Sequence, residues 1–221
     1  IFSDILIINY ALGQELDYTP SPVLGPYNES FWETTESEFI EKCEPVYEAI
    51  RRVREELDDS KSLIGFAAAP YTICKYMVER QDLNIVQKLI PYIVTHLSMQ
   101  IEAGCDTIQI FDSHACDISE DDFYDFVIAP TKTIVDVIRA HYPHICIIAF
   151  PRLIGDKINK YIEVVNPDCT NISDDKPIDE IHGEVLQGGI SVRRLIKGED
   201  ITPVLDKMQG KPYIVNLAHG I

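Results

Sequence analysis

The sequence is poor in basic residues: it has 19 Lys and Arg against 36 Asp and Glu, which gives a net charge of −17. A surface of that sign repels the phosphates of nucleic acid, so we exclude a nucleic-acid partner. No apolar run approaches the roughly 20 residues of a membrane helix, so we expect no membrane span. The chain also lacks a basic segment before its first apolar run, as a secretion signal requires, and we expect a cytoplasmic protein.

Disulfide patterns are missing as well. The six cysteines are scattered, with no C-x-x-C pair, and most of them sit in apolar runs. This distribution is typical of buried free thiols in a reducing compartment. At 221 residues, with 46% hydrophobic and 25% charged residues, the chain has an ordinary globular composition and the length of one well-buried domain.

Two kinds of apolar segment alternate along the chain. Apolar residues recur at helical spacing in four segments, which predict amphipathic helices over residues 36–57, 85–101, 123–138 (with Pro130 as a potential break) and 158–165. Between and around them lie strand-like apolar runs at residues 1–8, 62–69, 106–111, 145–150, 168–173, 184–190 and 212–218.

Strands that alternate with helices predict parallel pairing through right-handed crossovers. A doubly wound open sheet would need a Gly-rich turn after its first strand, and Ile5–Gly13 contains none. We therefore predict an α/β fold, a (β/α)8 TIM-type barrel, as a single domain over residues 1–221. The seven runs are one short of this barrel, and we expect the first strand to be missing before Ile1 and the C-terminus to be truncated. Asp174–Gly183, about ten residues, is at the lower limit for a helical crossover.

Several strand-like runs end in polar side chains, and in a barrel such ends meet at the catalytic face. The first run carries Asp4, a carboxylate that is costly to bury without hydrogen-bond donors. The second leads toward Tyr76, and the third is followed by Ser113 and His114. The last delivers His219, beside a glycine that permits close approach of the backbone.

Two other chemistries fit parts of this pattern. Ser113 beside His114 suggests a nucleophile with its base, but neighbouring side chains on a strand point to opposite faces and no G-x-S-x-G elbow is present. His114 and Cys116 could supply two zinc ligands, but no third ligand other than His219 is evident. Arg152 is either a fork for a carboxylate or a solvated charge.

Short motifs spread over the whole chain match those of one enzyme family. They are Ile1-Phe2-Ser3-Asp4-Ile5-Leu6, Gly65-Phe66-Ala67-Ala68-Ala69-Pro70-Tyr71-Thr72 continuing to Tyr76-Met77-Val78-Glu79, Gln109-Ile110-Phe111-Asp112-Ser113-His114-Ala115, Phe150-Pro151-Arg152, Leu186-Gln187-Gly188 and Asn216-Leu217-Ala218-His219-Gly220. In this order the motifs resemble the uroporphyrinogen decarboxylase family.

The resemblance implies a distorted (β/α)8 barrel with no cofactor and no metal, which forms a homodimer. It also implies a tetrapyrrole substrate, uroporphyrinogen III, bound in a cleft at the C-terminal barrel face. The four acetate side chains of this substrate lose CO2 to give coproporphyrinogen III in haem biosynthesis. Residue by residue, the resemblance makes Asp4 and Tyr76 catalytic. It makes Phe111 (an apolar wall), Ser113 and His219 substrate-binding.

The chain departs from the family pattern in three places. The family's N-terminal R-Q-A-G-R segment, which supplies substrate-binding arginines, is absent. Because an acidic chain must bind eight substrate carboxylates, we expect such arginines upstream of Ile1. A Gly/Ser-rich stretch is missing at Arg80/Gln81, and Gly189-Ile190-Ser191-Val192 stands where the family has N-x-D-P.

Zinc-dependent corrinoid methyltransferases of the same barrel superfamily are the alternative. Their H-x-C ligand pair is expected where this chain has Phe150-Pro151-Arg152, a segment with no zinc ligand. A non-catalytic binding barrel is a third hypothesis, which requires that the gene encode no upstream arginines.

Overall fold

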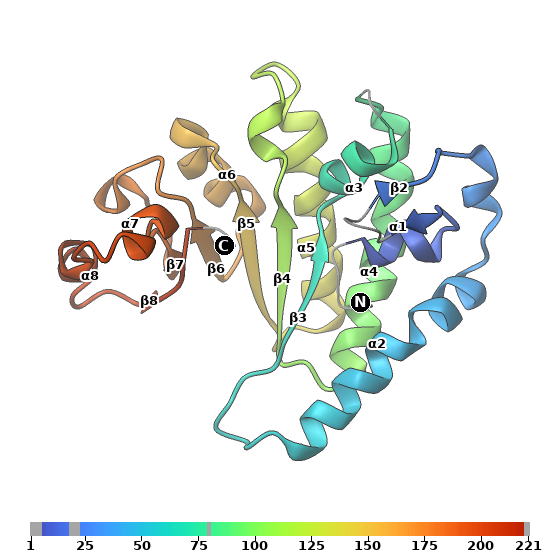
Figure 1. Ribbon diagram of the computed structural model, residues 1–221, viewed down its shortest axis with the longest axis horizontal. Coiled ribbons are helices and arrows are strands. Elements are labelled where there is room, and N and C mark those ends of the chain that lie inside the picture. The colour runs from blue at the N-terminus through green and yellow to red at the C-terminus, as the bar shows by residue number, and fades with distance from the viewer. Residues whose placement is uncertain (1–5, 18–22, 79–80, 219–221) are drawn as a thin grey trace.

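Six parallel strands form the centre of the protein in the computed structural model, which describes residues 6–17, 23–78 and 81–218 (Figure 1). Each strand pairs with the next one along the chain. The strands are β3 (Ile64–Ala68), β4 (Thr107–Asp112), β5 (Cys146–Pro151), β6 (Cys169–Ile172), β7 (Leu186–Gly188) and β8 (Tyr213–Ile214). A separate antiparallel pair, β1 (Leu16–Asp17) and β2 (Val23–Leu24), lies nearer the N-terminus.

Parallel strands paired in chain order, with helices between most of them, are the arrangement of a (β/α)8 barrel. The predicted α/β fold of this type is therefore confirmed, and each predicted strand after the first overlaps an observed strand. Over the described ranges the sheet is open, with β3 and β8 at its two edges.

Helices pack along the sheet (Figure 1). The central one, α4, contacts α2, α3, α5 and the strand β3, and α6 contacts α5. The helices are α1 (Ile7–Ala11), α2 (Glu36–Glu56), α3 (Pro70–Met77), α4 (Leu83–Glu102), α5 (Ala129–His141), α6 (Ile158–Val165), α7 (Val192–Ile196) and α8 (Thr202–Lys207), with short 3-10 turns at Glu29–Glu33, Ala115–Asp117, Gly155–Lys157 and Ile178–Glu180. In the part of the chain that the structure describes, every helix is too short or too polar to cross a membrane.

The two longest helices begin where the sequence supplies acceptors for their first N–H groups. At α2 the Thr35 hydroxyl accepts from the Glu38 N–H at 3.3 Å, and the Glu38 carboxylate accepts from the Thr35 N–H at 2.9 Å, which forms a capping box. At α4 the Asp82 carboxylate accepts from the Asn84 N–H at 3.0 Å. Both helices were predicted from their apolar spacing, and both predictions are confirmed.

The two faces of the sheet carry different side chains because successive residues of a strand point to opposite sides. Toward the helices, Ile108 and Ile110 of β4 and Ile147 of β5 are fully buried in the main hydrophobic core. The other face carries Phe111 and Phe150, which pair directly in the register of β4 and β5 and lie outside that core. In a closed barrel this second face is the interior.

The first predicted strand is a helix where the structure describes it. Residues 1–5 lie outside the described residues, and α1 occupies the end of the run 1–8, so a strand there is wrong. Ile7, Ile8 and Ala11 are buried, and α1 contacts α2 and α3. Apolar residues at positions i, i+1 and i+4 form one helix face, a period that a short apolar run does not distinguish from a strand.

Two helix boundaries differ from the prediction because of proline. Pro70 occupies the first turn of α3, where its missing N–H costs nothing, and this helix follows β3 although none was predicted there. Pro130 occupies the first turn of α5 and does not break the predicted helix. A π-helical segment, Tyr124–Ile128, leads into α5 at this point.

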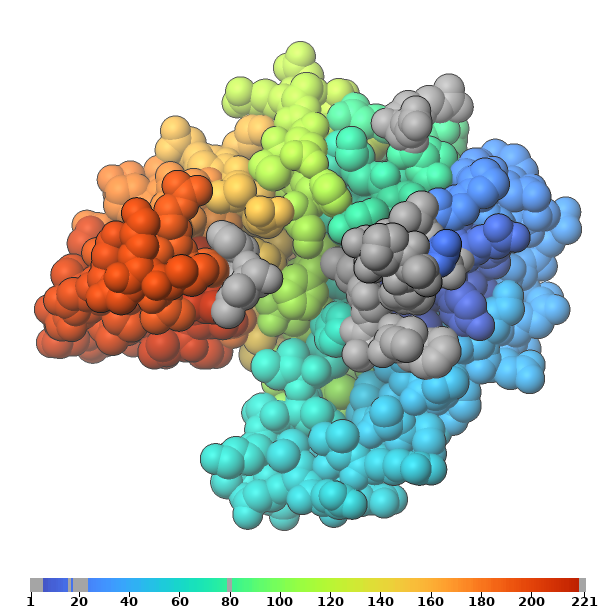
Figure 2. Space-filling view, in the orientation of Figure 1, coloured from blue at the N-terminus to red at the C-terminus, as the bar shows by residue number. Residues whose placement is uncertain are grey.

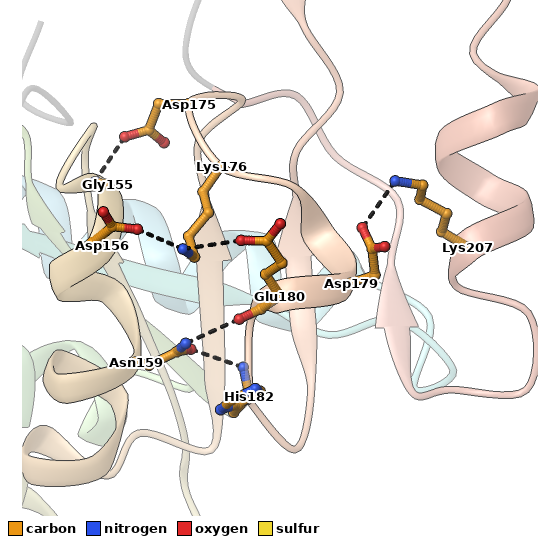
Figure 3. A network of polar contacts seen from close by, with 9 residues as sticks. All are labelled: Gly155, Asp156, Asn159, Asp175, Lys176, Asp179, Glu180, His182 and Lys207. Atoms are coloured by element: carbon orange, nitrogen blue, oxygen red, sulfur yellow. Dashed lines mark hydrogen bonds and ion pairs between the residues drawn. The ribbon is translucent and has the colours of Figure 1, made fainter.

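The connection between β6 and β7, whose length is at the lower limit for a helical crossover, contains the 3-10 turn Ile178–Glu180 and, over its described residues, no α-helix. Polar contacts tie it to the neighbouring helix α6 and the turn before it (Figure 3). Lys176 pairs with Asp156 at 2.6 Å and with Glu180 at 3.2 Å. The Asn159 side chain donates to the Glu180 carbonyl at 2.9 Å. The ion pairs and hydrogen bonds therefore hold a connection that lacks a helix of its own.

The edge strand β3 is capped by a side chain of α4. Gln100, almost fully buried, accepts from the Phe66 N–H at 2.9 Å and donates to the Phe66 carbonyl at 2.8 Å. These are backbone groups that a neighbouring strand would otherwise use. A Cβ at Gly65 would lie 2.8 Å from the Gln100 side-chain oxygen, so a glycine is needed for this approach.

We expect Gln100→Met to lower the free energy of unfolding by about 1–3 kcal/mol, because it leaves the part-buried Phe66 N–H and carbonyl without these partners. Gln87→Met is the matched control, since Gln87 is exposed on the same helix, and it should change stability by less than about 0.5 kcal/mol. Chemical denaturation measures both. Equal effects of the two substitutions would contradict the role of Gln100.

Candidate active site

The carboxyl ends of β3 and β4 bring α3 against the turn that follows β4. The Ala69 N–H donates to the Phe111 carbonyl at 2.8 Å. The Thr72 hydroxyl donates to the Asp112 carboxyl at 3.2 Å, and its oxygen accepts from the His114 N–H at 3.3 Å. In Figure 2 the teal and yellow-green parts of the chain, which include α3 and the turn after β4, lie between the blue N-terminal and the orange-red C-terminal elements.

Tyr76 lies in the last turn of α3 and meets His114 of the neighbouring turn. The two rings are edge to face, with centroids 5.2 Å apart and an angle of 80° between their planes. The His114 Nδ1 contacts the Asp117 carboxylate at 2.6 Å, and this hydrogen bond holds the pKa of Asp117 below its usual range. Sequence reasoning missed Asp117, although the i, i+3 spacing from a histidine was a usable signal.

The imidazole of His114 therefore pairs with Asp117 rather than with Ser113. Ser113 is half-buried in the turn directly after β4. The Cys116 thiol also contacts Asp117, with its sulfur 3.4 Å from the carboxylate. Across residues 6–17, 23–78 and 81–218 no three His, Cys, Asp or Glu side chains gather as metal ligands would. The arrangement thus disfavours a serine nucleophile at Ser113, and the third zinc ligand considered for His114 and Cys116, His219, lies outside the described residues.

An aromatic row crosses the sheet on the face away from the helices. The ring of Phe111 packs edge to face with Phe66 at 5.8 Å and with Phe150 at 6.0 Å. The sequence predicted Phe111 as an apolar wall, and it missed the other two, although alternate positions on neighbouring strands share a face. The structure supplies an aromatic surface at Phe111; its contact with substrate stays a prediction.

Buried amides continue the same face. Gln109 shares it with Phe111, two residues away on β4, and Asn171 and Gln187 pair directly across β6 and β7. All three are less than a tenth exposed. The side-chain oxygen of Asn171 has no hydrogen-bond partner among the described residues. These amides, which sequence reasoning missed, bring hydrogen-bonding groups to an otherwise apolar surface.

Arg152 follows β5 at the same edge of the sheet. Its N–H donates to the Asp112 carbonyl at 3.2 Å, and its side-chain Nε is buried with no hydrogen-bond partner in the described part of the chain. The next residue, Leu153, has a φ of +52°, a left-handed conformation that is costly for a branched side chain. The Leu153 N–H donates to the Ser173 hydroxyl at 3.0 Å. A buried guanidinium donor of this kind suits a carboxylate.

A cavity of about 430 Å³ lies beyond this row, lined by the connection after β6 and by α7 and α8. Its three cations are Lys176, Arg194 and Lys207. Each already pairs with acidic side chains: Lys176 with Asp156 and Glu180, Arg194 with Glu199, and Lys207 with Asp179, the first and last of which appear in Figure 3. Because these acids neutralise the positive charge, we do not place an anionic ligand in this cavity.

Two of the predicted site residues, Asp4 and His219, lie outside the described residues. The structure brings Tyr76 together with the turn that contains Ser113. It places Phe111 on the sheet face away from the helices. The roles predicted for these residues remain predictions.

Asp112 points to the other side of β4 from Phe111 and is completely buried. Burial raises the pKa of this carboxyl to about 7, against the opposing effect of the Thr72 hydrogen bond. Its second oxygen has no hydrogen-bond partner among the residues that the structure describes. The phenols of Tyr161 and Tyr71 are close enough for Asp112 to contribute to their raised pKa values, each of which is due mainly to burial.

Comparison with known proteins identifies a family. The sequence model of the family uroporphyrinogen decarboxylase (URO-D) matches residues 1–221. A uroporphyrinogen decarboxylase from Rickettsia bellii is 35% identical over 254 residues, which cover 100% of this chain and 74% of that protein. The one from Rickettsia felis is 32% identical over 253 residues, which cover 100% and 72%.

Among solved structures, a methyltransferase from Methanosarcina mazei superposes with a TM-score of 0.73 at 13% identity, over 96% of this chain and 72% of that one. At this identity the likeness shows the fold alone.

We expect Asp112→Asn to remove part of the pH dependence of stability. The unfolded chain ionises Asp112 near its ordinary pKa of about 4, whereas the folded chain ionises it near 7. The wild-type protein therefore loses stability as the pH rises between these values, and Asn cannot ionise. Urea denaturation at about pH 5 and about pH 8 should show a smaller difference for the variant. Asp125→Asn, at an exposed position, should keep the wild-type difference. An unchanged difference in Asp112→Asn would refute the assignment.

Proposed function

Because this chain belongs to the uroporphyrinogen decarboxylase family, we propose that it removes CO2 from the four acetate side chains of uroporphyrinogen III to give coproporphyrinogen III. The family match over all of residues 1–221 carries this proposal. The enzyme would be a carboxy-lyase of haem biosynthesis. We also infer one barrel domain over residues 1–221, a homodimer and a cytoplasmic location, as the family resemblance implies.

The pyrrole ring supplies the electron sink for this chemistry. Protonation of a ring α-carbon makes a cation, which accepts the electron pair of the C–CO2 bond as CO2 leaves. The exocyclic carbon then takes up a proton to become a methyl group, and loss of the ring proton restores the pyrrole. Each acetate consumes one proton overall and releases one CO2. No external redox partner or electron carrier enters this balance.

Asp4 is the residue to which we assign stabilisation of that cation. A carboxylate that faces the four pyrrole N–H groups orients the macrocycle and places a fixed negative charge near the developing positive charge. The same N–H groups compensate the carboxylate for its loss of water. Asp4 would therefore both bind the macrocycle and stabilise the cation that forms on it.

The sheet face that carries the aromatic row supports a ligand built of pyrrole rings. Phe66, Phe111 and Phe150 present aromatic rings along it, and macrocycles of pyrroles have large apolar faces. Arg152, with its buried Nε unpartnered among the described residues, lies at the same edge and suits one substrate carboxylate. A single arginine leaves most of eight carboxylates unmatched in a chain of net charge −17.

We assign Tyr76, Ser113 and His219 to orientation of the substrate. The Tyr76 hydroxyl would hydrogen-bond to Asp4 or to a propionate, and His219 would donate to a substrate carboxylate. None of them needs to carry the reacting proton if the ring, an arginine or solvent does so. The edge-to-face packing on His114 supports this role, because it restricts the orientation of the Tyr76 ring.

We expect Asp4→Asn to fold normally and to lose at least about 100-fold in kcat, since an amide cannot supply the fixed charge. The assay incubates the full-length protein with uroporphyrinogen III under reducing conditions and measures coproporphyrinogen. Asp59→Asn, at an exposed aspartate, is the control and should keep full activity. Near-normal turnover by Asp4→Asn would end the assignment of Asp4, and a wild-type protein without turnover would end the proposed function.

Tyr76→Phe and His219→Asn should each lower kcat/KM by about 5- to 150-fold, the cost of one positioning hydrogen bond, without changing the shape of the pH–rate profile. Tyr124→Phe is the control for the first, because Tyr124 is 51% exposed. Loss of one limb of the profile in His219→Asn would reassign that histidine as the proton donor.

A further inference from the structure

Two threonines lie completely buried near the carboxyl end of β4, and only one of them is connected to the site. The Thr72 hydroxyl in α3 bridges Asp112 and the backbone of His114. The Thr131 hydroxyl in α5 has no partner at hydrogen-bond geometry within the described ranges; its neighbour is the Tyr161 phenol, whose pKa it lowers, and not the turn after β4. Thr131 is therefore a control: its substitution removes a buried hydroxyl without removing a hydrogen bond between α3 and the turn after β4.

We propose that Thr72 is a positioning residue for the site: its hydroxyl, oriented by Asp112, holds the turn that carries Ser113 and His114 against the helix that carries Tyr76. The effect on turnover rests on the proposed decarboxylase function. Thr72 itself touches no substrate in this proposal.

Asp112 determines the direction of the hydrogen bonds. A threonine hydroxyl has one hydrogen to donate and two lone pairs to accept with. The Asp112 oxygen, 3.2 Å away, takes the hydrogen, so the Thr72 oxygen is left to accept from the His114 N–H at 3.3 Å. The Thr72 and Asp112 side chains are fully buried, so solvent does not compete for the bond between them.

The backbone of His114 in turn fixes its side chain. The imidazole is held by Asp117 at 2.6 Å and packs on the Tyr76 ring at a centroid distance of 5.2 Å. Thr72 and Tyr76 are four residues apart on α3 and so lie on one side of the helix. The helix therefore contacts the turn twice, once through a hydrogen bond and once through the two rings. A shift of about 1 Å in such a group is enough to lower a rate by about 100-fold.

Thr72→Val keeps the shape of the side chain and removes the bridge. We expect kcat to fall about 10- to 100-fold with a smaller change in KM, because the side chains that contact substrate are still present and only their positioning is lost. Thr72→Ser retains the hydroxyl and should recover most of the loss. Thr131→Val removes a hydroxyl at equal burial and should leave kcat within about twofold.

Amide hydrogen exchange provides a readout that does not depend on activity. The His114 N–H loses its acceptor in Thr72→Val and should exchange at least about tenfold faster, whereas it should be unchanged in Thr72→Ser and Thr131→Val. Thermal melting of all three variants identifies any that fails to fold. If Thr72→Val does not fold, Thr72→Ala takes its place, with the same faster exchange of the His114 N–H expected because it also lacks the hydroxyl.

Each outcome decides something. Protected His114 exchange in Thr72→Val would overturn the bridge itself. Faster exchange with unchanged kcat, or equal loss of kcat in Thr72→Val and Thr131→Val, would overturn the positioning role. If the His114 N–H exchanges faster in Thr72→Val but the wild-type protein does not turn over uroporphyrinogen, the bridge is supported and the proposed function is rejected.

Discussion

The shared register of β3, β4 and β5 is the constraint from which the site follows. Parallel strands that pair residue by residue end at one edge, so the segments that leave them must meet there. The register places Phe111 directly beside Phe150 and sends the chain after β3 into α3, against the turn after β4. Residues about 40 positions apart in the chain, Tyr76 and His114, come into contact for this reason.

The two faces of the sheet at β4 carry different kinds of side chain. On the face away from the helices, aromatic rings and buried amides offer a surface for a ligand with apolar rings and polar substituents. On the helix side, Asp112 is buried with the Thr72 hydroxyl as its donor, and burial raises its pKa to about 7 against the lowering effect of that hydrogen bond. The cations of the cavity near α7 and α8 are neutralised by neighbouring acids, so this cavity offers little positive charge to a polyanion.

The apolar pattern predicted a helix correctly where it repeated over many residues. The helices α2 and α4 have four or more apolar repeats and good capping residues, and both were found as predicted. The run at residues 1–8 was wrong at its end because a short apolar segment fits a helix and a strand equally. The helix α3 was missed because its apolar residues continue those of β3 without a polar break, and only Pro70 marked its start.

The sequence by itself determined the alternation of strands and helices, the family motifs and the identity of Phe111, Ser113 and Tyr76 as residues near strand ends, because these depend on neighbours along the chain. Only the tertiary structure decided that His114 pairs with Asp117 and packs on Tyr76, that Phe66 and Phe150 flank Phe111, and that Thr72 bridges to Asp112. These contacts join separate elements. They depend on strand register and on how deeply each side chain is buried, and neither quantity can be read from the spacing of residues in one segment.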